Sequence, residues 1–146
     1  MKSRFAIALI LLASVFILGM GKMGPSEKAG EIPLAEKEVK AVITDNQGLT
    51  LNLTQFSVNG QVFLTGRLGA GRVTIPFNRI RTMVFSFEPK GTNVTVELTD
   101  GSQTTLSLEK GQTVYGKIRA GAYQVSIDHL KKIEIQAVAE RKKEKE

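Results

Sequence analysis

The sequence has 146 residues, a formal net charge of +6 at pH 7, no cysteine and one histidine. That length allows one domain or two very small ones. Without cysteine there are no disulfides and no acylated lipoprotein cysteine, and with one histidine the usual zinc-binding patterns are excluded. The positive charge favours anionic surfaces as partners but does not bear on the fold.

The N-terminus has the pattern of a secretory signal. Lys2 and Arg4 precede an almost wholly apolar run over residues 5–20, and Gly19 and Gly21 suit a cut after Gly21. The run is slightly long for a signal core and slightly short for a spanning helix, which needs about 20 residues. We favour a cleaved signal, with an uncleaved anchor as the alternative. Either one places the rest of the chain in the periplasm or on the outer face of the inner membrane.

Composition divides the rest of the chain. A stretch rich in Gly, Pro, Glu and Lys without apolar periodicity is typical of a linker, and the wholly charged end is typical of a solvated tail. We expect a signal or anchor at 1–21, a flexible linker at 22–37, a first β unit at 38–88, a second at 89–138 and a charged tail at 139–146.

The two β units are copies of one pattern. Residues 64–85 align with 114–135 at a constant offset of 50, and most apolar positions of one copy meet an apolar position of the other. Further upstream the offset is 55, which aligns 39–45 with 94–100. A repeated pattern of this length indicates a duplicated supersecondary unit.

The first copy is longer where residues 54–63 face 109–113. We expect a longer hairpin there, turning at Asn59-Gly60, because this dipeptide favours a type I′ turn. Lys110-Gly111 is expected to turn the shorter hairpin of the second copy.

Each copy is predicted to form five short strands. Val39, Ala41 and Ile43 alternate with polar residues, as a half-buried strand does. Pro76 cannot donate to a ladder, so "PFNR" is expected to form a corner or one helical turn before the fifth strand. The prediction is an all-β fold of two tandem, similar, five-stranded, barrel-like units.

Gly69-Ala70-Gly71 could cradle a phosphate or form a tight turn. The second copy has Arg119 where the first has Gly69, and only the Ala-Gly pair is retained. A phosphate loop needs backbone donors at a helix N-terminus, whereas the residues that follow alternate as a strand. We therefore expect a turn.

Catalytic candidates have simpler structural explanations. His129 stands beside Asp128 in one copy only and is expected at an exposed corner. Asp45 and Asp100 occupy equal places in Thr-Asp turns, where the carboxylate bonds its own backbone. No nucleophile, base and orienting group occur together, so we predict no enzyme, no catalytic residue, no metal site and no cofactor.

Basic residues recur in both copies. Arg67 aligns with Lys117, and Arg81 aligns with Lys131; Arg72 and Arg119 lie near them. If the copies pack around a twofold axis, these six residues could form one basic face for an anionic polymer or lipid headgroups. The alternative is solvated strand edges kept basic to resist edge-to-edge pairing.

The pattern "LTDG…L.L……G……VSIDHLKKIEI" resembles the small bent-sheet modules of bacterial proteins, of the Sm and PRC-barrel types. The resemblance covers about fifty residues per copy. It implies a non-catalytic module for assembly or ligand binding, and it carries over no site residue. The polar signature of RNA-binding Sm proteins is lacking, so nucleic acid is not an expected partner.

Together these observations predict an exported, non-catalytic envelope module that is structural or binds a partner. The expected partner is an envelope protein or a cell-wall component. The alternative is a module that binds polyanions or anionic lipids through the basic face.

Overall fold

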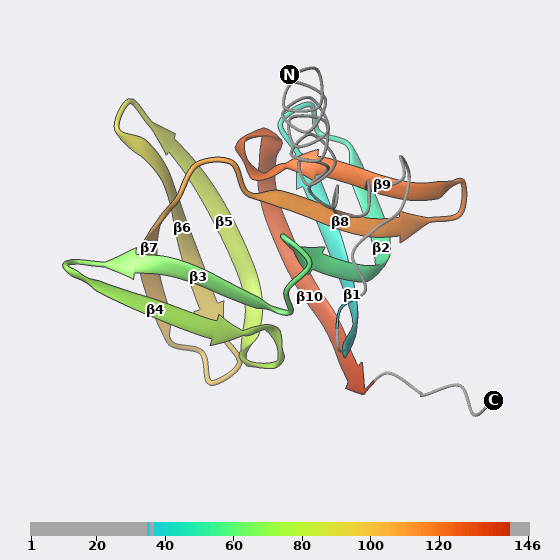
Figure 1. Cartoon of the computed structure of the whole chain (residues 1–146), viewed down its shortest axis with the longest axis horizontal. Helices are drawn as coiled ribbons and strands as arrows, with labels where there is room; N and C mark the ends of the chain where they lie inside the picture. The colour runs from blue at the N-terminus through green and yellow to red at the C-terminus, as the bar shows by residue number, and fades with distance from the viewer. Residues whose placement is uncertain (1–34, 36, 141–146) are drawn as a thin grey trace, which may run out of the picture.

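The computed structural model describes residue 35 and residues 37–140. Within them the chain forms ten strands, which confirms the all-β prediction with five strands per repeat (Figure 1). The strands are β1 (Lys37–Asp45), β2 (Thr50–Val58), β3 (Phe63–Leu68), β4 (Gly71–Pro76), β5 (Ile80–Glu88), β6 (Gly91–Leu98), β7 (Gln103–Leu108), β8 (Thr113–Ile118), β9 (Gly121–Ser126) and β10 (Leu130–Glu140). The 3-10 turns η2 (Phe77–Arg79) and η3 (Ile127–His129) precede β5 and β10. The predicted signal or anchor, nearly all of the linker and the last six residues lie outside the described residues.

Alternation explains where the strands bury their side chains. In β1, Val39, Ala41 and Ile43 are at most 2% exposed, while the residues between them are exposed or half-buried. This is the burial that a period of two produces on one face of a sheet. No helix within residues 37–140 is long and apolar enough to cross a membrane.

The predicted turns and corners are present. Asp45 Oδ1 accepts the backbone N–H groups of Gln47 and Leu49, both at 2.9 Å. The backbone N–H and the hydroxyl of Ser102 both donate to Asp100. Pro76 lies directly before η2, which is the single helical turn expected there.

The ten strands form one antiparallel sheet in the order β4-β3-β7-β6-β5-β10-β1-β2-β8-β9. The sheet bends into two lobes that meet at β5 and β10 (Figure 1). We call β3 to β7 the first lobe, and β1, β2, β8, β9 and β10 the second lobe. Each lobe therefore combines strands from both repeats. The repeats have exchanged their last three strands, β3-β4-β5 for β8-β9-β10.

The exchange is organised around a pseudo-twofold axis. The lobes join through three pairs between β5 and β10: Thr82 with Glu134, Met83 with Ile133, and Val84 with Lys132. Met83 and Ile133 are equivalent positions at the offset of 50, and both are fully buried. The axis passes through this pair, so the two lobes share one continuous core.

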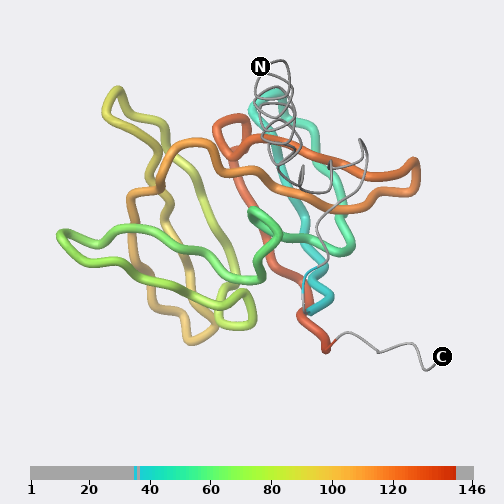
Figure 2. Tube along the Cα trace, in the orientation of Figure 1, coloured from blue at the N-terminus to red at the C-terminus, as the bar shows by residue number. Residues whose placement is uncertain are grey.

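The predicted hairpin across residues 54–63 is wrong. Asn59 and Gly60 do turn, with φ of 51° and 78°, and Val58 pairs with Gln61. However, β2 pairs with β1 and β8, and β3 pairs with β4 and β7. Residues 59–62, the first link, instead carry the chain from one lobe to the other. Residues 109–112, the second link, carry it back, so Lys110-Gly111 closes no hairpin either (Figure 2).

One glycine is kept in each repeat because two strands approach closely there. A Cβ on Gly66 of β3 would lie 2.8 Å from Leu106 Cβ of β7. A Cβ on Gly116 of β8 would lie 2.9 Å from Leu53 Cβ of β2. Real Cβ atoms hardly ever come so close. Each glycine, having no side chain, therefore lets the exchanged hairpin pack against the neighbouring strand of the lobe that it joins.

Candidate functional site: a polar cleft between the second link and β3

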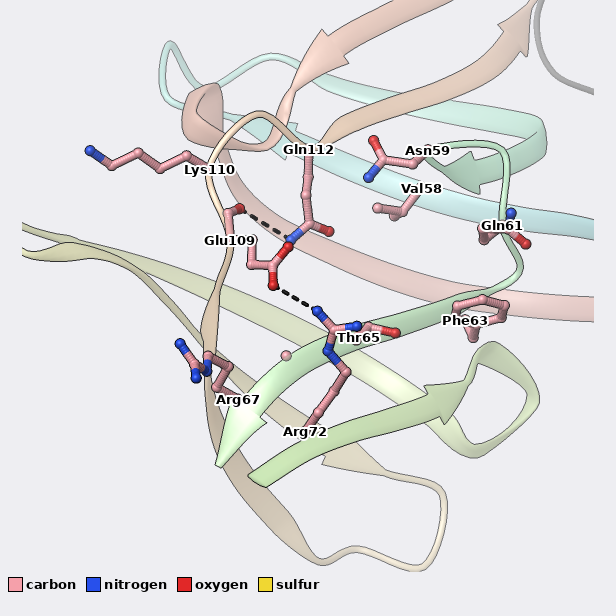
Figure 3. A pocket seen from close by; sticks show the side chains of 11 residues that line it. Val58, Asn59, Gln61, Phe63, Thr65, Arg67, Arg72, Glu109, Lys110 and Gln112 are labelled. Carbon is pink, nitrogen blue, oxygen red and sulfur yellow. Dashed lines mark hydrogen bonds and ion pairs between the residues drawn. The ribbon is translucent and has the colours of Figure 1, made fainter. Parts of the chain in front are cut away.

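A cleft of about 260 Å³ lies where the second link passes the β3–β4 hairpin (Figure 3). Its walls are β3 and the start of β4 on one side and the second link on the other, and residues 58–61 close one end. Most of the lining side chains are polar or charged, and Val58 and Phe63 are the large apolar ones.

The cleft exists because the pairing of β3 with β7 is shorter than the equivalent pairing of β8 with β2. We call each of these two pairings a seam. In the first lobe, β3 pairs with β7 at one position only, Arg67 with Ser107. In the second lobe, β8 pairs with β2 at Thr54, Ser57 and Val58. The five residues that the first repeat has in excess, 54–58, are the half of β2 that makes those pairs. Since β7 ends five residues sooner, nothing continues along β3, and the space there remains open.

The lining of the cleft carries more positive than negative charge. Arg67 and Arg72 are direct cross-strand partners, so their side chains lie on the same face of the hairpin. Arg72 Nη2 donates to Glu109 Oε1 at 2.8 Å, and both side chains are 64% exposed. Gln112 Nε2 donates to the carbonyl oxygen of Glu109 at 3.2 Å, which braces the second link. With Lys110, the lining holds three cations and one anion.

The structure brings only some of the predicted basic residues together. Arg67 and Arg72 share the cleft. Arg81 is exposed on β5 and pairs with Glu97 at 3.1 Å.

The remaining basic candidates lie elsewhere. Lys131 is exposed on β10, away from the cleft lining. Lys117 and Arg119 lie at the tip of the β8–β9 hairpin, which points away from the β3–β4 tip in Figure 1. Arg67 and Lys117 therefore sit in different lobes, and the strands do not join them in one basic face.

The acidic candidates occupy structural positions. The hydroxyl of Ser102, and then its backbone N–H, hold the pKa of Asp100 below its ordinary value of 3.8. His129 is exposed in η3, and Asp128 accepts the hydroxyl of Thr92 at 3.1 Å. Gly69, with φ of 60°, turns the β3–β4 hairpin, as the strand alternation predicted.

Sequence reasoning missed the other wall of the cleft: Glu109, Lys110 and Gln112. The sequence predicts a short hairpin turn for these residues. The five-residue difference between the repeats was the available signal, because a missing strand segment leaves a partner edge uncovered. The sequence alone does not distinguish this missing segment from a shorter hairpin within one unit.

Comparison with known proteins places the chain in a family. Residues 35–138 match the model of a family described as "Uncharacterised protein", and the chain belongs to that family. Searches of curated proteins and of solved structures found no match.

Proposed function

We propose that the protein is an exported, non-catalytic module of the cell envelope that binds a partner polypeptide in the cleft. Export is supported by the sequence alone, through Lys2, Arg4 and the apolar run at residues 5–20. Absence of cysteine accords with an exported protein whose core holds by packing.

One observation carries the binding role: the first lobe has an open seam where the second lobe has a closed one. An unpaired strand edge is a ready template for another chain. Phe63, Thr65 and Arg67 of this edge line a cleft with mixed charges, so a partner would meet both backbone and side-chain groups.

The basic residues give less support to the alternative of a polyanion or lipid surface. They are divided between two lobes, and Arg72 and Arg81 already have carboxylate partners. A broad anionic surface is bound best by a contiguous field of charge.

Photo-crosslinking in the source cells tests the proposal. A photoreactive amino acid replaces Lys110 in the full chain, and the matched control replaces Lys90 at the exposed tip between β5 and β6. Both changes remove one lysine charge. We expect an envelope protein to crosslink from position 110 and not from position 90. If neither position yields a protein adduct, or both yield the same one, binding in the cleft is wrong.

A further inference from the structure

We infer that the cleft takes an extended acidic polypeptide segment, which pairs as a strand with the free edge of β3. This inference rests on the proposed function and specifies the partner's chemistry. The argument uses the direction of the backbone groups in β3, the occupant of the equivalent place in the second lobe, and the charges on one face.

The backbone of β3 is directed at the cleft. Leu68 and Gly71 close a two-residue turn, so they form a hydrogen-bonded pair. Hydrogen-bonded and non-bonded pairs alternate along an antiparallel ladder, so the N–H and C=O groups of Phe63, Thr65 and Arg67 point away from β4. Arg67 uses them with Ser107 of β7. Phe63 and Thr65 have no ladder partner on this side within the described residues, and both line the cleft.

The position of Pro76 is consistent with this alternation of hydrogen-bonded and non-bonded pairs. It stands opposite Phe63 in a pair that exchanges no hydrogen bonds, so its missing N–H would have faced away from β3 in any case.

The second lobe shows what fits such a place. Tyr115 is the equivalent of Thr65 at the offset of 50, and it pairs with Ser57; Val114, the equivalent of Leu64, pairs with Val58. Both partners belong to the five extra residues of the first repeat. The chain thus fills one of its two equivalent seams with its own extended segment. Within the described residues no strand fills the other seam beyond the pair of Arg67 with Ser107, and we infer that a segment of another polypeptide occupies it.

Side-chain alternation indicates the composition of that segment. Residues 63, 65 and 67 share one face with Arg72, and this face carries the positive charge. A residue of the incoming strand that pairs with Thr65 points its side chain to the same face. An acidic side chain at that position is the diagonal neighbour of Arg67, on the face that also carries Arg72. Residues between them face the side of buried Leu64 and favour an apolar side chain.

Glu109 already shows how a carboxylate is received. It reaches Arg72 from the second link at 2.8 Å and balances one of the three cations. An incoming carboxylate would replace it or join it through Arg67 and Lys110. Removal of the Glu109 charge should therefore strengthen binding of an acidic segment.

The test is fluorescence anisotropy with the full chain and a labelled probe, acetyl-Glu-Val-Glu-Val-Glu-amide. We expect it to bind about tenfold more tightly than the same peptide with Lys in place of Glu. The probe residue that pairs with Thr65, and the residues two positions from it, direct their own N–H groups to β3. These are the Glu positions. Methylating the Glu amide nitrogens should abolish binding, while methylating the Val nitrogens should weaken it much less.

Protein variants assign the site. Arg67→Gln with Arg72→Gln should weaken binding at least about tenfold, and Glu109→Gln should strengthen it about two- to fivefold. Lys117→Gln with Arg119→Gln removes the same charge from the second lobe and should leave binding unchanged. Unchanged circular dichroism keeps loss of binding distinct from unfolding.

Several results would overturn the inference. Equal binding of both methylated probes would mean that no strand forms. Insensitivity to the Arg67 and Arg72 changes would place the site elsewhere. Binding of phosphatidylglycerol vesicles in place of the probe, lost with the same two arginines, would identify a lipid ligand. If the crosslink from position 110 persists while every probe fails, the binding module stands and the acidic strand is wrong.

Discussion

Gly66→Ala tests whether the exchanged hairpin depends on close approach to β7. The new Cβ would lie 2.8 Å from Leu106 Cβ, 3.1 Å from the carbonyl oxygen of Ser107 and 3.2 Å from Leu106 Cδ1. Leu106 is fully buried, so it can move away from the new Cβ only by displacing other side chains of the core. Overpacking of this kind costs about 1–3 kcal/mol. Replacing glycine recovers about 0.4–1 kcal/mol by restricting the unfolded chain. We therefore expect a net loss of about 1.3 kcal/mol at the midpoint of these ranges, whose limits are about 0 and about 2.6 kcal/mol.

Gly71→Ala is the matched control in the same hairpin. The nearest atom to its added Cβ is the Leu68 carbonyl oxygen at 3.7 Å, and its φ is not positive. Only the effect on the unfolded chain remains, so this variant should be neutral or slightly more stable. Urea unfolding followed by far-UV circular dichroism measures both variants. Equal midpoints for the two would show that β3 does not approach β7 as described.

Other consequences can be measured on the same material. Residues 35–88 alone should form a dimer by light scattering, because one repeat holds three of the five strands of the first lobe and two of the five of the second; a folded monomer would contradict the exchange. Phe85→Ala should cost about 3–5 kcal/mol and Ile135→Ala about 1–2 kcal/mol, since Phe85 is 6% exposed whereas Ile135 is half-buried. Asp100→Ala should lower stability at pH 7. Because the pKa of Asp100 is depressed in the folded state, its contribution is present above the ordinary value of 3.8 and is lost as the pH falls through the lower folded pKa, so the two urea midpoints should converge in acid.

Local features of the fold were predictable from the sequence. Alternation located the strands, the Asp turns followed from side-chain bonds to the local backbone, and Pro76 marked the corner at η2. Each depends on a few neighbouring residues, so each is encoded where it occurs.

Pairing between distant strands was not predictable in the same way. Both repeats have the same apolar pattern, so β2 has equal apparent complementarity for β3 and for β8. The choice depends on residues 54–58, whose length suits a strand along β8 rather than a return along β3. The cleft was not predictable for the same reason, because its position is set by where β7 ends and not by any motif in its lining.

The pseudo-twofold axis at Met83 and Ile133 has a bearing on how such a cleft can arise. Two identical half-chains around that axis would have identical seams, and any insertion in one would appear in the other. Both seams would then be closed, or both open. Joining the halves in one gene removes that constraint. Five residues could enter one copy alone, where they seal one side and brace the molecule, while the other side is left free to acquire a ligand.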